Sequence, residues 1–212
     1  MATLRAAGTH IRQFSWPDQA AGRGVEPQGT GPGDWLGRAR LVRARALAET
    51  SAAFDAGGSN VTIVCRELAD RVAAVLGATA LIRPLGGGMT DLPIAVSQAG
   101  GRRHHEVVKL VEADPHALAA ACSARAAQMR GSILLPQVDA KALRLWSERS
   151  AWPWLDALGI GSMLVAAVCA RRRAVGSIVV WRPRAGPPLQ EDDRLFVEEV
   201  ARRLAGAHRL QS

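Results

Sequence analysis

The sequence predicts an α+β domain with a single antiparallel sheet of about five or six strands, flanked by helices and with helical N- and C-terminal ends. The first observation is the order of patterns along the chain: helical stretches, two strands, a variable middle with helices, two further strands and a last helix. The second is the length, because 212 residues suit one good-sized domain with extensions. The third is a composition with 48% hydrophobic residues but no tyrosine, which predicts a core of Ala, Val, Leu and Ile with a few indoles.

The N-terminal part of the chain divides into a leader and a helix. Residues 1–33 are rich in Gly and Pro and poor in aliphatic side chains, which predicts a disordered leader. Residues 34–56 are predicted to form an amphipathic helix that begins at the N-cap Asp34. Its apolar row consists of Trp35, Ala39, Val42 and Ala46. Residues 57–212 form the predicted sheet-containing domain.

This domain opens with a helix that Asn60 caps and Gly77 ends. Period-two patterns then predict strands at residues 78–83 and 92–98, with a glycine turn at residues 86–88 between them. A third strand is predicted at residues 106–112, although the apolar pair Val107 and Val108 departs from strict alternation.

The second half of the domain begins with a helix from Pro115 to a C′ glycine at Gly131. A short strand at residues 133–135 and short helical pieces at residues 140–148 and 152–158 follow. Gly159 and Gly161 bracket the turn into the next strand, where both are expected to need positive φ. Two β-branched strands are predicted at residues 163–169 and 175–181, joined by an arginine-rich turn. The last helix spans residues 191–210 and carries acidic residues in its first turn, where the helix dipole favours negative charge.

Composition excludes several classes of protein. No run of about 18 apolar residues occurs without a charge, and residues 1–15 lack the apolar stretch of a signal peptide. Cys65, Cys122 and Cys169 lie far apart, which argues against a disulfide framework or a cysteine zinc site and favours a reducing compartment. The net charge of +8 is spread along the chain, whereas a nucleic-acid footprint would cluster. We therefore expect a cytoplasmic protein with neither a membrane nor a nucleic-acid partner.

Three segments resemble the C-terminal half of a GAF domain, especially in actinobacterial sensors and regulators. They are residues 159–165, residues 176–180 and the acidic residues 191–193 that open the last helix. A weaker similarity at residues 76–82 extends the resemblance to about residues 60–210. Ala167 and Val168 stand where many members have Pro-Leu, and Gln190 stands where Ser or Thr usually caps the last helix. The chain is thus a divergent member, and its pocket chemistry does not follow from the family.

The resemblance implies a GAF/PAS-like, non-catalytic sensory or regulatory domain that binds a small molecule between the sheet and the irregular segment before the last hairpin. It also implies a homodimer formed through the terminal helices, and a signalling partner protein. In this chain the irregular segment holds the candidate ligand-binding residues Trp146, Arg149, Trp152 and Trp154, beside Arg144. An apolar wall with basic groups suits a flat or anionic ligand. The alternative is that the indoles fill the core. The sequence identifies neither the ligand nor a cofactor.

Two further functions are alternatives within the resemblance. One is a thiol-dependent enzyme like the free methionine sulfoxide reductases, although the close cysteine pair of that branch is missing and the three cysteines are better interpreted as small apolar side chains. The other is a ligand-free dimerisation or scaffold module. His104, His105 and Glu106 predict no metal site, because adjacent strand residues point to opposite faces. We assign no catalytic and no metal-binding residue.

Overall fold

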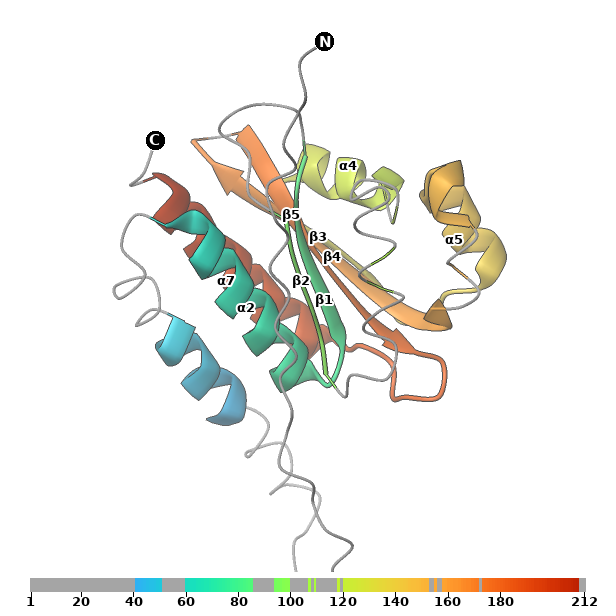
Figure 1. Cartoon of the computed structure of the whole chain (residues 1–212), viewed down its shortest axis with the longest axis horizontal. Helices are drawn as coiled ribbons and strands as arrows, with labels where there is room; N and C mark the ends of the chain where they lie inside the picture. Colours follow the sequence, from blue (N-terminus) through green and yellow to red (C-terminus); the bar gives the residue numbers. More distant parts are fainter. Residues whose placement is uncertain are drawn as a thin grey trace, which may run out of the picture.

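A computed structural model of the chain describes residues 41–50, 60–85, 94–99, 107, 109, 118, 120–152, 155, 158–171 and 173–209. Within these residues, one five-stranded sheet has the order β2-β1-β5-β4-β3, and every neighbouring pair is antiparallel. The strands are β1 (Thr79–Pro84), β2 (Ala95–Gln98), β3 (Ser132–Leu135), β4 (Ile160–Ala170) and β5 (Arg173–Pro183). Helices cover both faces of the sheet (Figure 1). The predicted fold class is confirmed.

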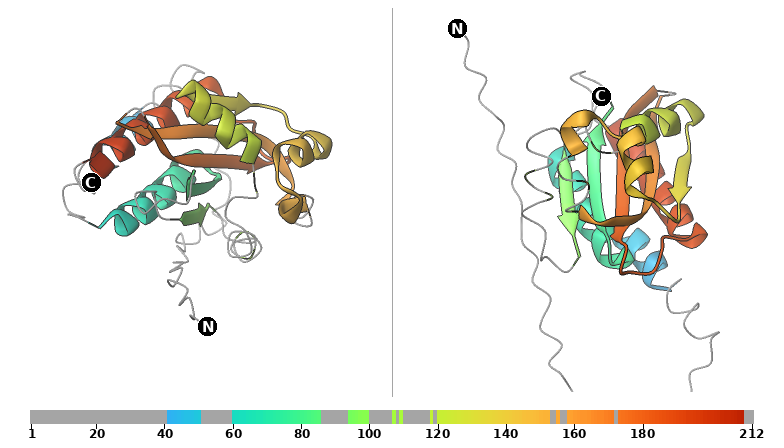
Figure 2. Two further views of the ribbon diagram at one scale, coloured as in Figure 1. Left: turned by 90° about the horizontal axis from the view of Figure 1, so that it is seen from above. Right: turned by 90° about the vertical axis from the view of Figure 1, so that its right-hand side faces the viewer.

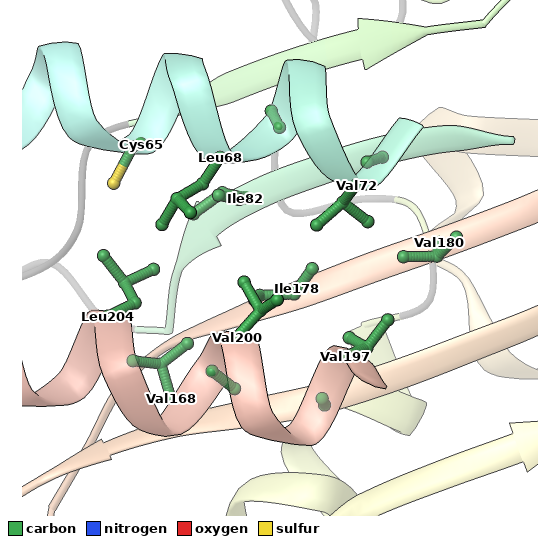
Figure 3. Packing of buried hydrophobic residues seen from close by; sticks show 14 of the residues in the cluster. Cys65, Leu68, Val72, Ile82, Val168, Ile178, Val180, Val197, Val200 and Leu204 are labelled. Carbon is green, nitrogen blue, oxygen red and sulfur yellow. The ribbon is translucent and has the colours of Figure 1, made fainter. Parts of the chain in front are cut away.

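One face of the sheet is covered by α2 (Val61–Leu76) and α7 (Glu191–Arg209), which lie side by side. Residues 41–50, called the 41–50 helix below, pack beside them. The apolar stripes of both helices meet the sheet: Leu68 and Val72 from α2, and Val200 and Leu204 from α7, lie over Ile178 and the other inward residues (Figure 3). These stripes have the spacing of three and four that the sequence shows, which is why both segments are helical.

The opposite face is covered by α4 (Ala120–Met129), α5 (Ala140–Trp146) and the 3₁₀ turn η1 (Arg149–Ala151) (Figure 2). Successive strand residues alternate between the two faces: Ala80 and Ile82 belong to the α2 and α7 cluster, and Leu81 belongs to the α4 and α5 cluster. The irregular segment that holds the predicted ligand-binding residues therefore lies on the side away from the terminal helices.

The predicted ends of α2 are confirmed in detail. The Asn60 side chain accepts hydrogen bonds from the backbone N–H groups of Thr62 and Ile63, at 3.1 and 3.3 Å. Gly77 takes the left-handed conformation with φ of 56°, and its N–H and that of Ala78 donate to carbonyls of the last turn. Both features satisfy backbone groups that a helix end leaves without partners.

Three local predictions need correction. Val107 and Lys109 are helical, so residues 106–112 do not form the predicted strand at these positions; the strict alternation that a strand needs is broken there. The helix before β3 ends on Arg130, with φ of 52°, and not on Gly131 as the left-handed residue. Of the two glycines predicted to need positive φ, only Gly159 has it. Gly161 instead lies where a Cβ would come within 2.5 Å of the Cα of Arg184.

Several predictions fall on residues outside the described part of the chain. These are the leader at residues 1–33, the first part of the helix at residues 34–56 and both of its boundaries, the turn at residues 86–88, the start of the helix at Pro115, and His104, His105 and Glu106. None of the described helices is long and apolar enough to cross a bilayer.

Candidate functional site

The structure brings three of the five predicted site residues together at the surface. The guanidinium carbons of Arg144 and Arg149 lie 5.8 and 5.9 Å from the centroid of the Trp152 ring. The Trp152 side chain remains 38% exposed. We call these three residues the Trp152 cluster. Both arginines are within the distance at which a cation is attracted to an aromatic face, a contact worth about 0.5–1 kcal/mol at an exposed site.

Local sequence explains why the cluster forms on this segment. Val138 and Leu143 insert into the apolar cluster on the α4 face, and Leu155 and Leu158 do the same after η1. These anchors hold α5 and the following turn against the sheet, so the polar positions between them face outward. Arg144 and Arg149 are both exposed, on either side of the bend between α5 and η1. The bend is what places two side chains five residues apart over one indole.

The other two predicted residues do not join this group. Trp146 is half-buried and packs against the apolar cluster under α5. Trp154 lies outside the described residues. Within the described part of the chain, no group of three or more His, Cys, Asp or Glu side chains could hold a metal ion.

A buried polar network that sequence reasoning missed lies on the same face of the sheet. Arg83 of β1 is only 2% exposed, and its Nε donates to the Ser177 hydroxyl of β5 at 3.3 Å. The Ser177 hydroxyl donates in turn to Ser123 of α4, also at 3.3 Å. The signal in the sequence is strand alternation: Arg83 and Ser177 stand in phase with the inward residues Leu81 and Val179. A buried arginine is costly unless its donors are paired, so this network fixes α4 on the sheet.

A second network that the sequence did not indicate joins α7 to two other elements. Asp193, 2% exposed, accepts a hydrogen bond from the backbone N–H of Gln190 at 2.9 Å and pairs with Arg43 of the 41–50 helix. The Arg182 guanidinium of β5 lies 3.5 Å from the other side of the carboxylate. Arg182 also donates to the Leu76 carbonyl at the end of α2. The acidic first turn of α7 was predicted from the helix dipole alone, and the ion pairs depend on elements far away in the sequence.

The three cysteines are poorly suited to thiolate chemistry. Cys65 lies in the cluster under α2 and Cys122 in the cluster under α4, on opposite faces of the sheet. Burial raises the pKa of the Cys65 thiol to about 12. Burial also raises the pKa of Cys122 and of Cys169, although Arg83 and Arg130, respectively, act in the opposite direction. A thiol with a raised pKa holds little of the thiolate that nucleophilic attack requires.

Three surface clefts lie away from the Trp152 cluster. One of about 520 Å³ lies at the end of the sheet between Val138, Gly161 and Arg184. Another of about 520 Å³ lies between the end of α4 and α7, beside Cys169 and Leu195. The third, of about 420 Å³, lies between the 41–50 helix and α7, and Leu47, Leu195 and Phe196 line it. We call this third cleft the helix-pair groove.

Solved structures with this architecture are GAF domains and related proteins. The GAF domain of an Acinetobacter phosphoenolpyruvate-protein phosphotransferase is 13% identical, with a TM-score of 0.55 over 84% of this chain and 94% of that chain. The nlh2 GAF domain of A. aeolicus in an inactive state is 11% identical, with a TM-score of 0.55 over 82% and 99%. A free methionine-R-sulfoxide reductase from Neisseria meningitidis, in complex with its substrate, is 14% identical, with a TM-score of 0.54 over 82% and 92%.

These similarities show a common fold. No curated protein matches the chain. The family model of the GAF domain matches residues 60–208, which include all five strands of the described sheet, the helices α2, α4 and α5, and α7 except its last residue. The chain therefore belongs to the GAF domain family.

Proposed function

We propose that this chain is a non-catalytic regulatory domain that binds a flat, anionic small molecule at the Trp152 cluster. The observation that carries the proposal is the pair of arginines over a partly exposed indole. A flat ring can stack on the indole while a carboxylate or phosphate pairs with a guanidinium, and arginine offers two parallel donors to such groups. Net charge of +8 also favours anionic over cationic ligands.

Ligand binding is tested with matched charged and uncharged probes. AMP and adenosine share the flat base, and only AMP carries phosphate. We therefore expect AMP to raise the melting temperature progressively as its concentration rises, and adenosine to have a smaller effect. Indole-3-acetate and benzoate serve as carboxylate probes. Trp152→Ala should abolish the shift, and Arg149→Gln should weaken it. Lys141→Gln removes a charge from the exposed side of α5 without contacting the indole and should leave the shift unchanged.

Stability measurements show whether Trp152 lines a ligand site or fills the apolar core. Because Trp152 is partly exposed, Trp152→Ala should cost less than the roughly 3–5 kcal/mol typical of deleting a buried large aromatic side chain. If no probe shifts the melting temperature of the native chain, the ligand-free scaffold is the better function. A shift that persists in Trp152→Ala shows binding at another site and contradicts the Trp152 cluster as the ligand site.

We further propose that the domain forms a homodimer through the 41–50 helix and α7. Leu41 and Val42 of the first helix and Leu195 of the second are exposed, and Leu195 also lines the helix-pair groove. An exposed apolar patch on paired terminal helices is suited to a twofold interface, which would bury the same patch on both subunits. A signalling partner protein would then recognise the arrangement of these helices in the dimer.

Sedimentation of the full chain at tens of micromolar tests this interface. We expect a dimer that Leu195→Asp converts to a monomer. Leu145→Asp is the matched control, because Leu145 is at least as exposed but lies on α5, on the other side of the sheet. A monomer in the native chain, or equal effects of the two variants, contradicts the dimer.

The methionine sulfoxide reductase alternative comes from the family resemblance, and a reductase of this kind shares the fold, but the cysteine environments weigh against it. We expect no reduction of free methionine sulfoxide and slow thiol labelling in the native protein. Rapid labelling of two cysteines, with turnover that is lost when they are changed to Ser, would establish the enzyme instead. The described thiols are all free, which fits the cytoplasmic location that this proposal assumes.

A further inference from the structure

We infer that the 41–50 helix is a charge-held latch: it docks reversibly on α7 and α2 through arginine contacts centred on Arg43 and Asp193. The inference bears on the proposed dimer surface, since this helix forms part of it, but the contacts that carry it lie within one chain. Apolar contacts contribute little to the docking of this helix. In the 41–50 helix only Ala46 and Thr50 are buried, and Leu47 is half-buried, whereas α2 buries seven residues. The described part of this helix therefore offers little apolar surface to hold it against α2 and α7.

Polar contacts hold the 41–50 helix against α7 and α2 at three points. Arg43 pairs with Asp193 and lies 3.6 Å from Asp192, both in the first turn of α7. Further along, the Arg203 guanidinium of α7 donates to the Leu47 carbonyl. Glu49, two residues after Leu47, lies 3.7 Å from Arg71 of α2. Each contact includes a charged group, so salt weakens the docking more than it weakens the apolar core.

Asp193 keeps other partners when the 41–50 helix undocks. Asp193 keeps the backbone N–H of Gln190 and the Arg182 guanidinium as partners. Losing Arg43 therefore does not leave an unpaired buried carboxylate, which would be strongly unfavourable. Arg43 itself, already partly exposed, returns to water. The docked and undocked states thus both satisfy the charges, as a reversible latch requires.

Undocking changes the apolar surface beside α7. Arg43, Ala44 and Leu47 form one wall of the helix-pair groove, and Leu195 and Phe196 form the other. Undocking removes the first wall and exposes the side of Phe196 that the helix covers. The latch would thereby change the apolar surface that α7 presents to a second copy.

Hydrogen–deuterium exchange of the full chain tests the latch. We expect Arg43→Gln to increase exchange in peptides from residues 41–50 at least tenfold, while peptides from α2 and β4 stay protected. Arg45→Gln is the matched control: Arg45 is two residues away, its side chain is 82% exposed, and its ion pair is with Glu49 of the same helix. It should change exchange little. Raising NaCl from 50 to 500 mM should move the native chain toward the behaviour of Arg43→Gln.

Three outcomes would overturn the latch: equal exchange in the two variants, exchange that salt does not change, or a rise that extends to α2 and β4, which would indicate global destabilisation. The test does not depend on the proposed dimer. A chain that is monomeric in sedimentation but shows the local, salt-dependent rise contradicts the dimer and supports the latch; a dimer without that rise does the reverse.

Discussion

In the described part of the chain, the helices α2 and α4 are each followed by a left-handed residue, and one of these two residues is a glycine. Gly77 ends α2 with φ of 56°, and Arg130 ends α4 with φ of 52°. At both ends the next N–H donates to a carbonyl five residues back, Ala78 to Ala73 and Gly131 to Ala126. The backbone therefore forms the same cap in both places, and at α4 a side chain with a Cβ occupies the position that glycine prefers.

Arg130→Gly should accordingly stabilise the protein by about 0.5–1 kcal/mol, because relief of left-handed strain exceeds the added flexibility of the unfolded chain. Urea unfolding measures the change. The control is Arg125→Gly on the same helix. Arg125 is exposed to solvent and lies in the middle of α4, so a glycine there should destabilise the protein by about 1 kcal/mol. If both substitutions destabilise, the strain at Arg130 is not the dominant effect.

The buried thiol of Cys65 predicts a loss of stability in alkaline solution. Its pKa is about 12 in the folded protein against 9.0 for the unperturbed group, so between these values the unfolded chain binds fewer protons than the folded one. The contribution of the thiol is complete below pH 9 and is lost as the pH rises toward 12. Between pH 8 and 10 this loss is on the order of 1 kcal/mol.

The measurement is urea unfolding at pH 8 and pH 10 for the native chain and for Cys65→Ala. The variant has a lower stability at pH 8 but should lose less between the two pH values, by on the order of 1 kcal/mol, since the titrating group is gone. Equal losses in the two proteins would show that Cys65 ionises in the folded state as it does in the unfolded chain.

At the scale of an element, the start of α7 is organised by one carboxylate. Asp193 closes the first turn by accepting from Gln190, while Arg43 and Arg182 neutralise it. Asp192, its neighbour, has a side chain that is 42% exposed and lies farther from Arg43. The two residues carry the same charge at the same helix terminus, so they differ mainly in burial and in partners.

We therefore expect Asp193→Ala to destabilise the protein by about 1.5–3 kcal/mol, because the backbone N–H of Gln190 loses its acceptor and Arg182 loses its buried carboxylate partner. Asp192→Ala should cost under about 1 kcal/mol, as for an exposed ion pair. Thermal unfolding of both variants compares them directly. Similar losses would mean that the helix dipole, which both carboxylates share, outweighs the ion pairs.

At the scale of the whole molecule, the sheet carries a separate apolar cluster on each face. Both clusters depend on the same strands, because neighbouring residues such as Leu81 and Ile82 point to opposite sides. Trp181 reports on the α4 and α5 side, whereas α2 and α7 supply much of the helical signal on the other side. Because the two clusters share these strands, loss of the strands disrupts both clusters together.

A single unfolding transition is therefore expected. Tryptophan fluorescence and far-ultraviolet circular dichroism should give the same urea midpoint for the native chain. The control is Trp181→Phe, which removes the buried reporter and should lower the fluorescence change without separating the two midpoints. Two distinct midpoints in the native chain would show that the faces unfold independently.

Most of the fold could be predicted from the sequence because local patterns decide it. The Asn60 cap, the Gly77 terminus and the period-two strands around residues 163–169 and 175–181 depend on neighbouring residues only. The strand expected at residues 106–112 was wrong at its described positions, where alternation was weakest. At the candidate site, the segment was identified from its tryptophans, but the geometry that joins Arg144 and Arg149 to Trp152 depends on a bend that no motif announces.

What the sequence by itself determined is the α+β class, most element positions and the GAF resemblance, since these depend on periodicity and on short motifs. What only the tertiary structure decided is which distant polar groups meet. Arg83 reaches Ser177 across 94 positions, and Arg43 reaches Asp193 across 150. Each of these residues alone looks like an ordinary strand or helix residue. Their roles arise when strand pairing and helix packing bring them together in a medium of low dielectric, where a charge must find a partner.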